Sequence, residues 1–280
     1  MFIIKLVWKL EFKDKQFDGP YEVAGIDIKN EGDKFKGVVY FPPTSFSKPY
    51  PLFIYLHGFP QIFTLQEIVK SHSFLLDEGY AFIAFNFRGY RYSQGNVSIQ
   101  SQVSDLFKIL EFVKKMATHN IFDLNNINLL AHDFGAYIGL IVCSKEDLIN
   151  NLIIISPILD LKRHIHSPEF SKVLVYINRF LPGNVRGVEN VGEFIKMTQK
   201  ELENSQYKIE EFISHLKAEK IKIIVGKDDK ITPLSEVESI FSQANIHPDI
   251  VKIDCMDHEC ILDTGEDEID KIKEEVKRSL

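Results

Sequence analysis

The chain has 280 residues, 45% hydrophobic and 26% charged, which is enough to bury a sizeable core in one large domain or in a domain with an insertion. A net charge of -7 without a basic tract argues against a nucleic-acid surface, and no apolar run is long enough to span a bilayer. Three cysteines are too sparse a set for a disulfide framework, so these features predict a cytoplasmic protein. The sequence gives no indication of the oligomeric state.

The N-terminal part of the chain has the pattern of β-strands. Residues 2–12 alternate between apolar and polar side chains, which predicts a half-buried strand. Charged residues interrupt this stretch before the apolar core of a signal peptide could form. Residues 21–28 and 35–41 flank a strong turn signal at 30–33, so we expect them to form a hairpin.

From residue 52 onward, continuous apolar strands alternate with helical patterns. The predicted strands are residues 52–56, 81–87, 127–131, 152–155, 221–225 and 250–253. The predicted helices are residues 64–78, 98–116, 134–143, a segment from 233, and 266–280. This alternation predicts an α/β fold with a mostly parallel sheet covered by helices on both faces.

Residues 158–219 interrupt the alternation. They are helical in pattern, richer in charge, and contain a Pro-Gly pair at 182–183. We therefore predict a small helical cap at 158–219, inserted into a core made of residues 1–157 and 220–280.

The stretch around Asp133 has the shape of a nucleophile elbow, in which a strand, a sharp turn and a helix hold one side chain at the top of the sheet. An apolar run ends abruptly at Asp133, and the small residues Ala131 and Gly135 stand two positions before and after it. Asp also tolerates a positive φ better than most residues, as the turn requires.

Two further residues follow later strands. Asp229 comes after the strand at 221–225, and His258 after the strand at 250–253. Ligands of parallel α/β sheets bind beyond the carboxyl ends of the strands, so the three side chains are expected at one edge. Nucleophile, acid and histidine in this chain order match the triad of α/β-hydrolases.

From residue 50 to 280 the sequence resembles the α/β-hydrolase superfamily, and most closely epoxide hydrolases and haloalkane or haloacid dehalogenases, which place Asp at the elbow. The motifs that carry the resemblance are HGFP at 57–60, RGY at 88–90 and HDFG at 132–135, and the Pro four residues after Asp229 selects it over Asp228. The sequence departs from the pattern at Asn86, Arg91 and Phe134. The run GYAFIAFNFRG and the upstream β-region are also similar to serine esterases and peptidases of the same fold.

An Asp nucleophile is suited to particular substrates. Its carboxylate is ionised at neutral pH, so it can attack an sp³ carbon of a small apolar substrate and form an alkyl ester, without a cofactor or metal. His258, oriented by Asp229, would then activate water to hydrolyse that ester. The resemblance implies that the backbone N–H groups of Phe59 and Phe134 form the oxyanion hole. An ester or peptide substrate fits less well, because attack by Asp133 would give a reactive mixed anhydride.

The leaving group separates two enzyme classes within this resemblance. Epoxide hydrolases use acidic hydroxyls, usually two tyrosines of the cap, and the predicted cap holds Tyr176 and Tyr207. Dehalogenases commonly use a tryptophan beside the nucleophile, whereas the only tryptophan here is Trp8. The epoxide interpretation therefore ranks above the halide interpretation.

Several alternatives stay open. Asp133 could cap the following helix, or be the relic of a serine enzyme in a catalytically silent protein, or be the atypical nucleophile of an esterase or peptidase. Cys255, His258 and Cys260 do not have a usual zinc spacing, so buried thiols are expected there. We expect His132 to pack beside the site, and His164 and His166 in the cap to be solvated.

Overall fold

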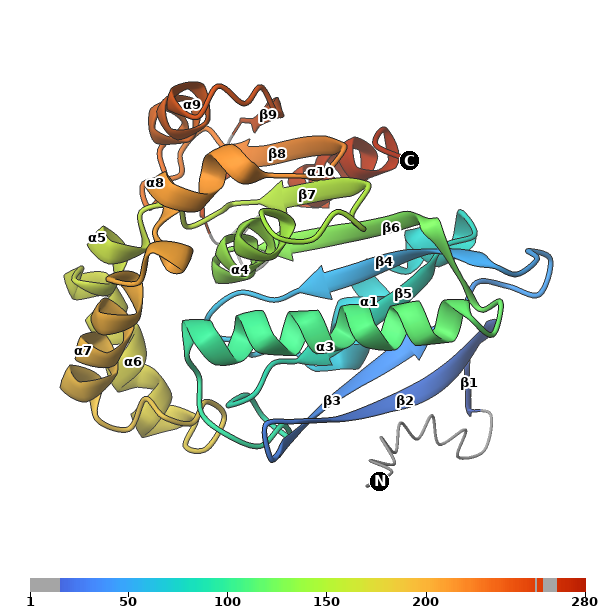
Figure 1. The fold of residues 1–280 in the computed structure, drawn as a ribbon, viewed down its shortest axis with the longest axis horizontal. Coiled ribbons are helices and arrows are strands. Elements are labelled where there is room, and N and C mark those ends of the chain that lie inside the picture. The colour runs from blue at the N-terminus through green and yellow to red at the C-terminus, as the bar shows by residue number, and fades with distance from the viewer. Residues whose placement is uncertain (1–15, 255, 259–265) are drawn as a thin grey trace, which may run out of the picture.

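A computed structural model describes residues 16–254, 256–258 and 266–280, so the predicted strand at 2–12 lies outside the described residues. Within the described part, nine strands form one sheet in the order β1-β2-β3-β5-β4-β6-β7-β8-β9 (Figure 1). Their bounds are β1 Gln16–Asp18, β2 Tyr21–Asn30, β3 Asp33–Tyr40, β4 Tyr50–Leu56, β5 Ala81–Asn86, β6 Phe122–His132, β7 Asn151–Ile155, β8 Lys220–Gly226 and β9 Asp249–Ile253. In this order, the strands β5, β4, β6, β7, β8 and β9 pair in parallel. Strands β1, β2 and β3 pair antiparallel with one another, and β3 pairs antiparallel with β5. The predicted fold class and the hairpin are confirmed.

Both faces of the sheet carry an apolar layer. Along β4, Leu52, Ile54 and Leu56 point into one core, whereas Phe53 and Tyr55 point into the other. This division follows from the period of two in a strand, and because both faces are buried the strand is apolar throughout. The helices outside residues 158–219 are α1 Leu65–Ser71, α2 Ser73–Asp77, α3 Ile99–Ala117, α4 Phe134–Cys143, α9 Leu234–Gln243 and α10 Glu266–Lys277. Helices α3, α4 and α9 contribute to the first core, and α1, α2 and α10 to the second.

The predicted helix at 64–78 is divided in two. The capping box of Thr64 and Glu67 opens α1 as predicted, but the helix is interrupted at His72. The ring of His72 hydrogen-bonds the carbonyl oxygen of Ile68 at 2.7 Å and stacks on Phe82. Burial lowers the pKa of His72 to about 4, so at neutral pH it is an uncharged core residue.

The segment between β7 and β8 is helical. It contains α5 Leu161–Ile165, α6 Pro168–Phe180, α7 Val191–Leu202 and α8 Ile209–Phe212, with single 3₁₀ turns at Ser205–Tyr207 and Ile213–His215. We call residues 158–219 the cap. Helices α5, α6 and α7 lie together beyond the carboxyl ends of the strands (Figure 1).

The cap is fastened to the core by backbone hydrogen bonds. The N–H of Arg91 donates to Asn184 at 2.8 Å, and the N–H of Arg186 donates to Gly89 at 2.8 Å. These bonds join the segment after α6 to the loop after β5, beside the predicted site. Among the helices of the described ranges, none combines the length and apolar character needed to cross a bilayer.

Candidate active site

Asp133 stands at a sharp turn between β6 and α4. Its backbone has φ 53° and ψ -120°, the left-handed conformation that the elbow pattern predicts. A Cβ at Gly135 would overlap the carbonyl oxygen of Leu56, so only glycine lets α4 begin this close to β4. The side chain of Asp133 makes no capping hydrogen bond to the described helix α4, which removes the helix-cap alternative.

His258 and Asp229 meet Asp133 at the edge of the sheet. The Nδ1 atom of His258 lies 2.9 Å from Oδ2 of Asp229, and its Nε2 atom lies 3.2 Å from Oδ1 of Asp133. The other oxygen of Asp229 accepts the backbone N–H groups of Ile231 and Thr232, each at 2.9 Å. The structure therefore brings the three residues of the predicted triad together, with Asp229 held by its own loop.

The loop that carries His258 packs closely on the end of β8. The N–H of Lys227 donates to Ile253 at 2.9 Å, and the N–H of Asp228 donates to Met256 at 3.2 Å. Gly226 lies directly under the Met256 carbonyl group, where a Cβ would overlap it. These contacts bring the end of β8 and the histidine loop to one place.

The two carboxylate oxygens of Asp133 have different partners. Oδ2 accepts the backbone N–H of Phe59 at 2.5 Å, whereas Oδ1 faces His258. The Phe59 N–H, one of the two groups predicted for an oxyanion hole, thus contacts the Asp133 carboxylate directly. The N–H of Phe134 belongs to the first turn of α4, whose N–H groups have no acceptor within the helix. The Asp133 residue is 5% exposed, so its charge is stabilised mainly by these partners.

The electrostatics of the triad follow from this geometry. Burial opposes a charge on His258, but the hydrogen bonds and charges of Asp133 and Asp229 outweigh it and raise its pKa to about 10. Burial acts against the charge of Asp133 as well, yet His258 and the Phe59 N–H hold the pKa of its carboxyl below the usual value. At neutral pH the resting site is a buried imidazolium between two carboxylates.

The RGY and HG motifs support the loop that carries Phe59. The Nε2 atom of His57 accepts the N–H of Phe87 at 3.2 Å, so its Nδ1–H donates to the carbonyl oxygen of Gly58 at 2.9 Å. Burial lowers the pKa of His57 to about 4, which keeps the ring neutral. Tyr90 packs edge-on against this ring, 4.5 Å between centroids. Sequence reasoning recognised these motifs but assigned them no supporting role.

Arg88 anchors the neighbouring loop after β5, which also carries Tyr90. Its backbone N–H and its Nε atom donate to the two oxygens of Asp105 at 2.8 and 2.7 Å, and Asn30 completes the contact. Burial raises the pKa of Asp105 to about 6 despite the neighbouring guanidinium. The Arg of the RGY motif therefore ties the loop to α3.

The two cap tyrosines lie away from Asp133. Tyr176 on α6 is 56% exposed and packs on Phe180, and the ring of Tyr207 lies under Lys145. The structure thus does not bring Tyr176 or Tyr207 to the nucleophile. The sequence places both tyrosines in the predicted cap but does not indicate which way their side chains face; Tyr176 lies on α6 and Tyr207 in the 3₁₀ turn Ser205–Tyr207.

A small apolar chamber lies beside the triad, between the core and the cap. Phe59 and Phe134 line it from the core, and Phe170, Phe194 and His164 from the cap. Its volume is about 20 Å³, room for about one water molecule. The prediction that His164 is solvated is wrong, because its half-buried ring packs against Phe170. His166 is exposed, as predicted.

No group of metal-ligating side chains occurs within the described ranges, and Cys255 and Cys260 of the clip considered above lie outside them. His132, at the end of β6, is a neighbour of the triad, and burial lowers its pKa to about 4.

The family model of the alpha/beta hydrolase fold matches residues 51–200, more than half of the chain. The chain belongs to the alpha/beta hydrolase fold family. The hydrolase resembles a lysophosphatidylserine lipase of Xenopus tropicalis, 26% identical over 141 residues. That match covers 49% of this chain and 34% of the lipase, so this chain matches about a third of its relative's length.

Solved structures share the fold. Est1E of Butyrivibrio proteoclasticus superposes with a TM-score of 0.67 at 17% identity, over 91% of this hydrolase and 96% of that chain. Dipeptidyl peptidase 4 of Porphyromonas gingivalis has a TM-score of 0.66 at 14% identity, over 93% of this chain and 35% of that one. A serine hydrolase homologue of Coxiella burnetii has a TM-score of 0.60 at 17% identity, over 91% of this chain and 96% of that one. These structures share the fold of this chain, and their names include a peptidase and a serine hydrolase homologue.

Proposed function

We propose that the protein hydrolyses a small apolar substrate, an epoxide in the first place, through a covalent ester on Asp133. The proposal rests on one observation: the two carboxylate oxygens of Asp133 have different partners. Oδ2 is held by the Phe59 N–H, and Oδ1 faces His258. A carboxylate fixed in this way is ionised and oriented, as an attacking group must be.

In the first step Oδ1 of Asp133 attacks an epoxide carbon, and the bond from that carbon to the ring oxygen breaks. The ring oxygen becomes an alkoxide on the side of that carbon away from Asp133 and takes a proton from solvent; once Asp133 is esterified, His258 releases its own proton to solvent. No metal or cofactor takes part in this step.

The second step uses the change in charge that the first one causes. Once Asp133 is a neutral ester, His258 loses one of the two carboxylates that raise its pKa. Its pKa falls toward the ordinary value of about 6.5, where it can accept a proton from water. The water attacks the ester carbonyl carbon, and the Phe59 N–H stabilises the charge that develops on Oδ2. The alkyl–oxygen group leaves and takes the proton from His258 to become the product diol, and the proton of the new Asp133 carboxyl passes to His258, which restores the resting site.

The developing alkoxide needs a hydrogen-bond donor on the cap side. Thr198 and Ser98 also line the chamber, but Thr198 already donates to Phe194 at 3.0 Å, and Ser98 caps α3. His164 brings a ring N–H to the same wall. Burial lowers its pKa, so at neutral pH it is an uncharged donor. We therefore assign to His164 the role that the sequence suggested for Tyr176 and Tyr207.

The proposal is tested by one turnover of styrene oxide in H₂¹⁸O with enzyme in excess. The ester mechanism places ¹⁸O in the carboxylate of Asp133 and leaves the first product unlabelled, because the product oxygen comes from Asp133. Mass analysis of the peptide containing Asp133 measures this. Label found in the product and not in Asp133 overturns the proposal.

The names of the relatives favour a second candidate, an esterase or peptidase with an atypical nucleophile. The Phe59 N–H and the His258–Asp229 pair would serve an acyl substrate in the same way. Turnover of p-nitrophenyl esters that disappears in Asp133→Ala would support it. The mixed anhydride that Asp133 would form with such a substrate is the chemical argument against it.

A further inference from the structure

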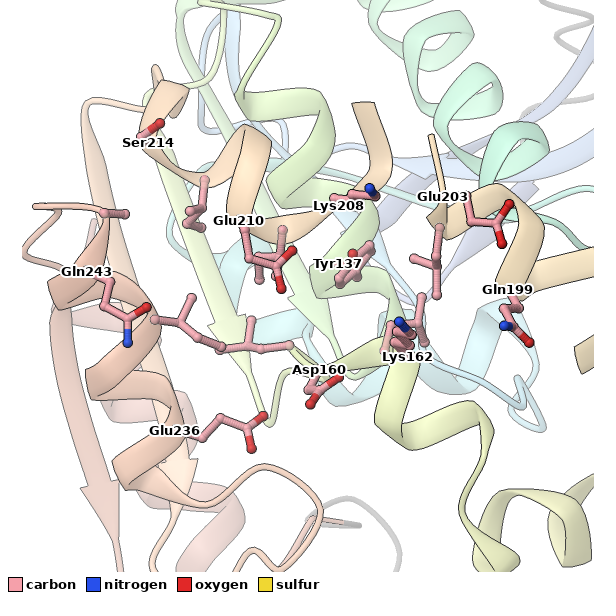
Figure 2. A pocket seen from close by; sticks show the side chains of 17 residues that line it. Tyr137, Asp160, Lys162, Gln199, Glu203, Lys208, Glu210, Ser214, Glu236 and Gln243 are labelled. Carbon is pink, nitrogen blue, oxygen red and sulfur yellow. The ribbon is translucent and has the colours of Figure 1, made fainter. Parts of the chain in front are cut away.

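A second and much larger hollow lies where the cap meets α9, with a volume of about 810 Å³ (Figure 2). We call it the cap cleft. Its floor is apolar and includes Tyr137, Leu159, Leu202, Ile209 and Ile240. This size is within the range of sites for small organic ligands, roughly 300–1,000 Å³, whereas the chamber beside Asp133 is far below it.

The rim of the cap cleft is predominantly acidic. Figure 2 shows four carboxylates, Asp160, Glu203, Glu210 and Glu236, against the two ammonium groups of Lys162 and Lys208. The carboxylates come from different segments, including the start of α5, α8 and α9.

Three of these carboxylates, Asp160, Glu210 and Glu236, act on groups near the cleft floor. Glu236 pairs with Arg163 at 2.6 Å through Oε2, while its Oε1 atom is buried without a hydrogen-bond partner among the described residues. Tyr137 lies on the floor, where burial first and the charges of Glu210 and Asp160 second raise the pKa of its hydroxyl. Arg163 also lies 4.0 Å from Asp160, so four carboxylates stand against Lys162, Lys208 and Arg163, and the remaining negative charge favours a cation over an anion.

Only a thin wall separates the cap cleft from the chamber. Leu161 lines both spaces. Shortly before Leu161 in the chain, Ile158 lines the chamber and the next residue, Leu159, lines the cleft. On α7, Thr198 faces the chamber and Gln199 the cleft. A substrate in the cleft is thus one side chain away from the space beside Asp133.

We propose that the cap cleft binds the body of a long-chain amphiphilic substrate with a cationic end. The apolar chain lies on the cleft floor, the ammonium group meets the acidic rim, and the reactive carbon reaches Asp133 past Leu161. This inference rests on the proposed function for its catalytic half, while its binding half stands on the cleft alone.

The binding half is tested on the full-length Asp133→Asn variant by titration calorimetry with octyltrimethylammonium and octyl sulfate. We expect the ammonium ligand to bind at least about tenfold more tightly than the sulfate, because both have the same chain. Glu210→Lys should weaken ammonium binding about tenfold. The matched control is Glu211→Lys on the same helix, outside the cleft, which should change it less than about twofold.

The catalytic half is tested on the otherwise unaltered enzyme with an epoxide on a long trimethylammonium chain and with styrene oxide. Ile240→Trp fills the cleft but not the chamber, so it should lower kcat/KM for the long substrate at least about tenfold more than kcat/KM for styrene oxide. If Ile240→Trp does not fold, Ala244→Phe in the same cleft is used in its place.

The outcomes separate the two proposals. Equal affinity for both octyl ligands, or an equal effect of the two glutamate variants, overturns the cleft proposal even where styrene oxide is hydrolysed. Selective ammonium binding without turnover of either epoxide supports the cleft as a binding site and counts against the proposed function. Equal losses for both epoxides in Ile240→Trp and Ala244→Phe overturn the path past Leu161.

Discussion

At the scale of single residues, Asp133 combines a costly backbone with a well-satisfied side chain. A non-glycine residue at φ 53° costs of order 1–3 kcal/mol, and such strain is found where the surrounding structure holds it. Here the N–H of Asp133 donates to Ile155, and its carbonyl accepts from Ala136. The carboxylate then needs no hydrogen bond from its own helix and is free to face His258.

The first prediction concerns the charge of His258. Its pKa of about 10 lies above the unfolded value of about 6.5, so its contribution to stability is complete below pH 6.5 and lost as pH rises through 10. We expect NMR titration of the imidazole to give a pKa well above 8 in the native enzyme. In Asp133→Asn one carboxylate is gone, so the pKa should fall by at least about one unit.

The control for this titration is His72, whose pKa is lowered to about 4 by burial and which has no contact with Asp133. Its titration should be the same in both proteins. An unchanged pKa of His258 in Asp133→Asn would contradict the charge coupling on which the second catalytic step depends.

At the scale of elements, close backbone contacts set the site. Gly58 leaves room for the Asp133 carboxylate, because a Cβ there would overlap it. Gly135 and Gly226 allow α4 and the histidine loop to approach β4 and β8 in the same way. The elements that carry the triad are therefore spaced by glycines rather than by side-chain packing.

The second prediction compares two glycines of one helix. Gly135→Ala places a methyl group against the Leu56 carbonyl oxygen, so the free energy of unfolding should fall by about 1–3 kcal/mol. In Gly139→Ala the nearest atom is the end of the Leu56 side chain at 3.2 Å, which can move. The free energy of unfolding of this control should be unchanged or rise by up to about 1 kcal/mol, because alanine has a higher helix propensity than glycine.

Urea unfolding monitored by circular dichroism measures both variants. We expect Gly135→Ala to lose activity in addition to stability, since α4 positions Asp133. Equal stability of the two variants would show that the spacing of α4 and β4 does not depend on Gly135.

At the scale of the whole molecule, the sequence predicted the sheet, the elbow and the meeting of Asp133 with His258 well. Periodicity and chain order determine these features, because parallel strands place their carboxyl ends at one edge. Prediction failed for Tyr176, Tyr207 and His164, which depend on how cap helices rotate against the core. Apolar residues occur on both sides of α6, so pattern alone did not show which side is buried.

Two further features required the three-dimensional structure. The break of the predicted helix at His72 follows from a ring that packs under β5, a tertiary effect without a Gly or Pro signal. The cap cleft combines α9 of the core with cap helices distant in sequence, so no local motif could indicate it.

The most direct measurement of the central claim is the intact mass of His258→Gln after exposure to styrene oxide. Without the base, ester formation proceeds and its hydrolysis stalls, so we predict one added substrate mass on the peptide containing Asp133. Asp133→Asn serves as the control and should gain none. An unmodified His258→Gln variant, or an adduct at another residue, would contradict nucleophilic attack by Asp133.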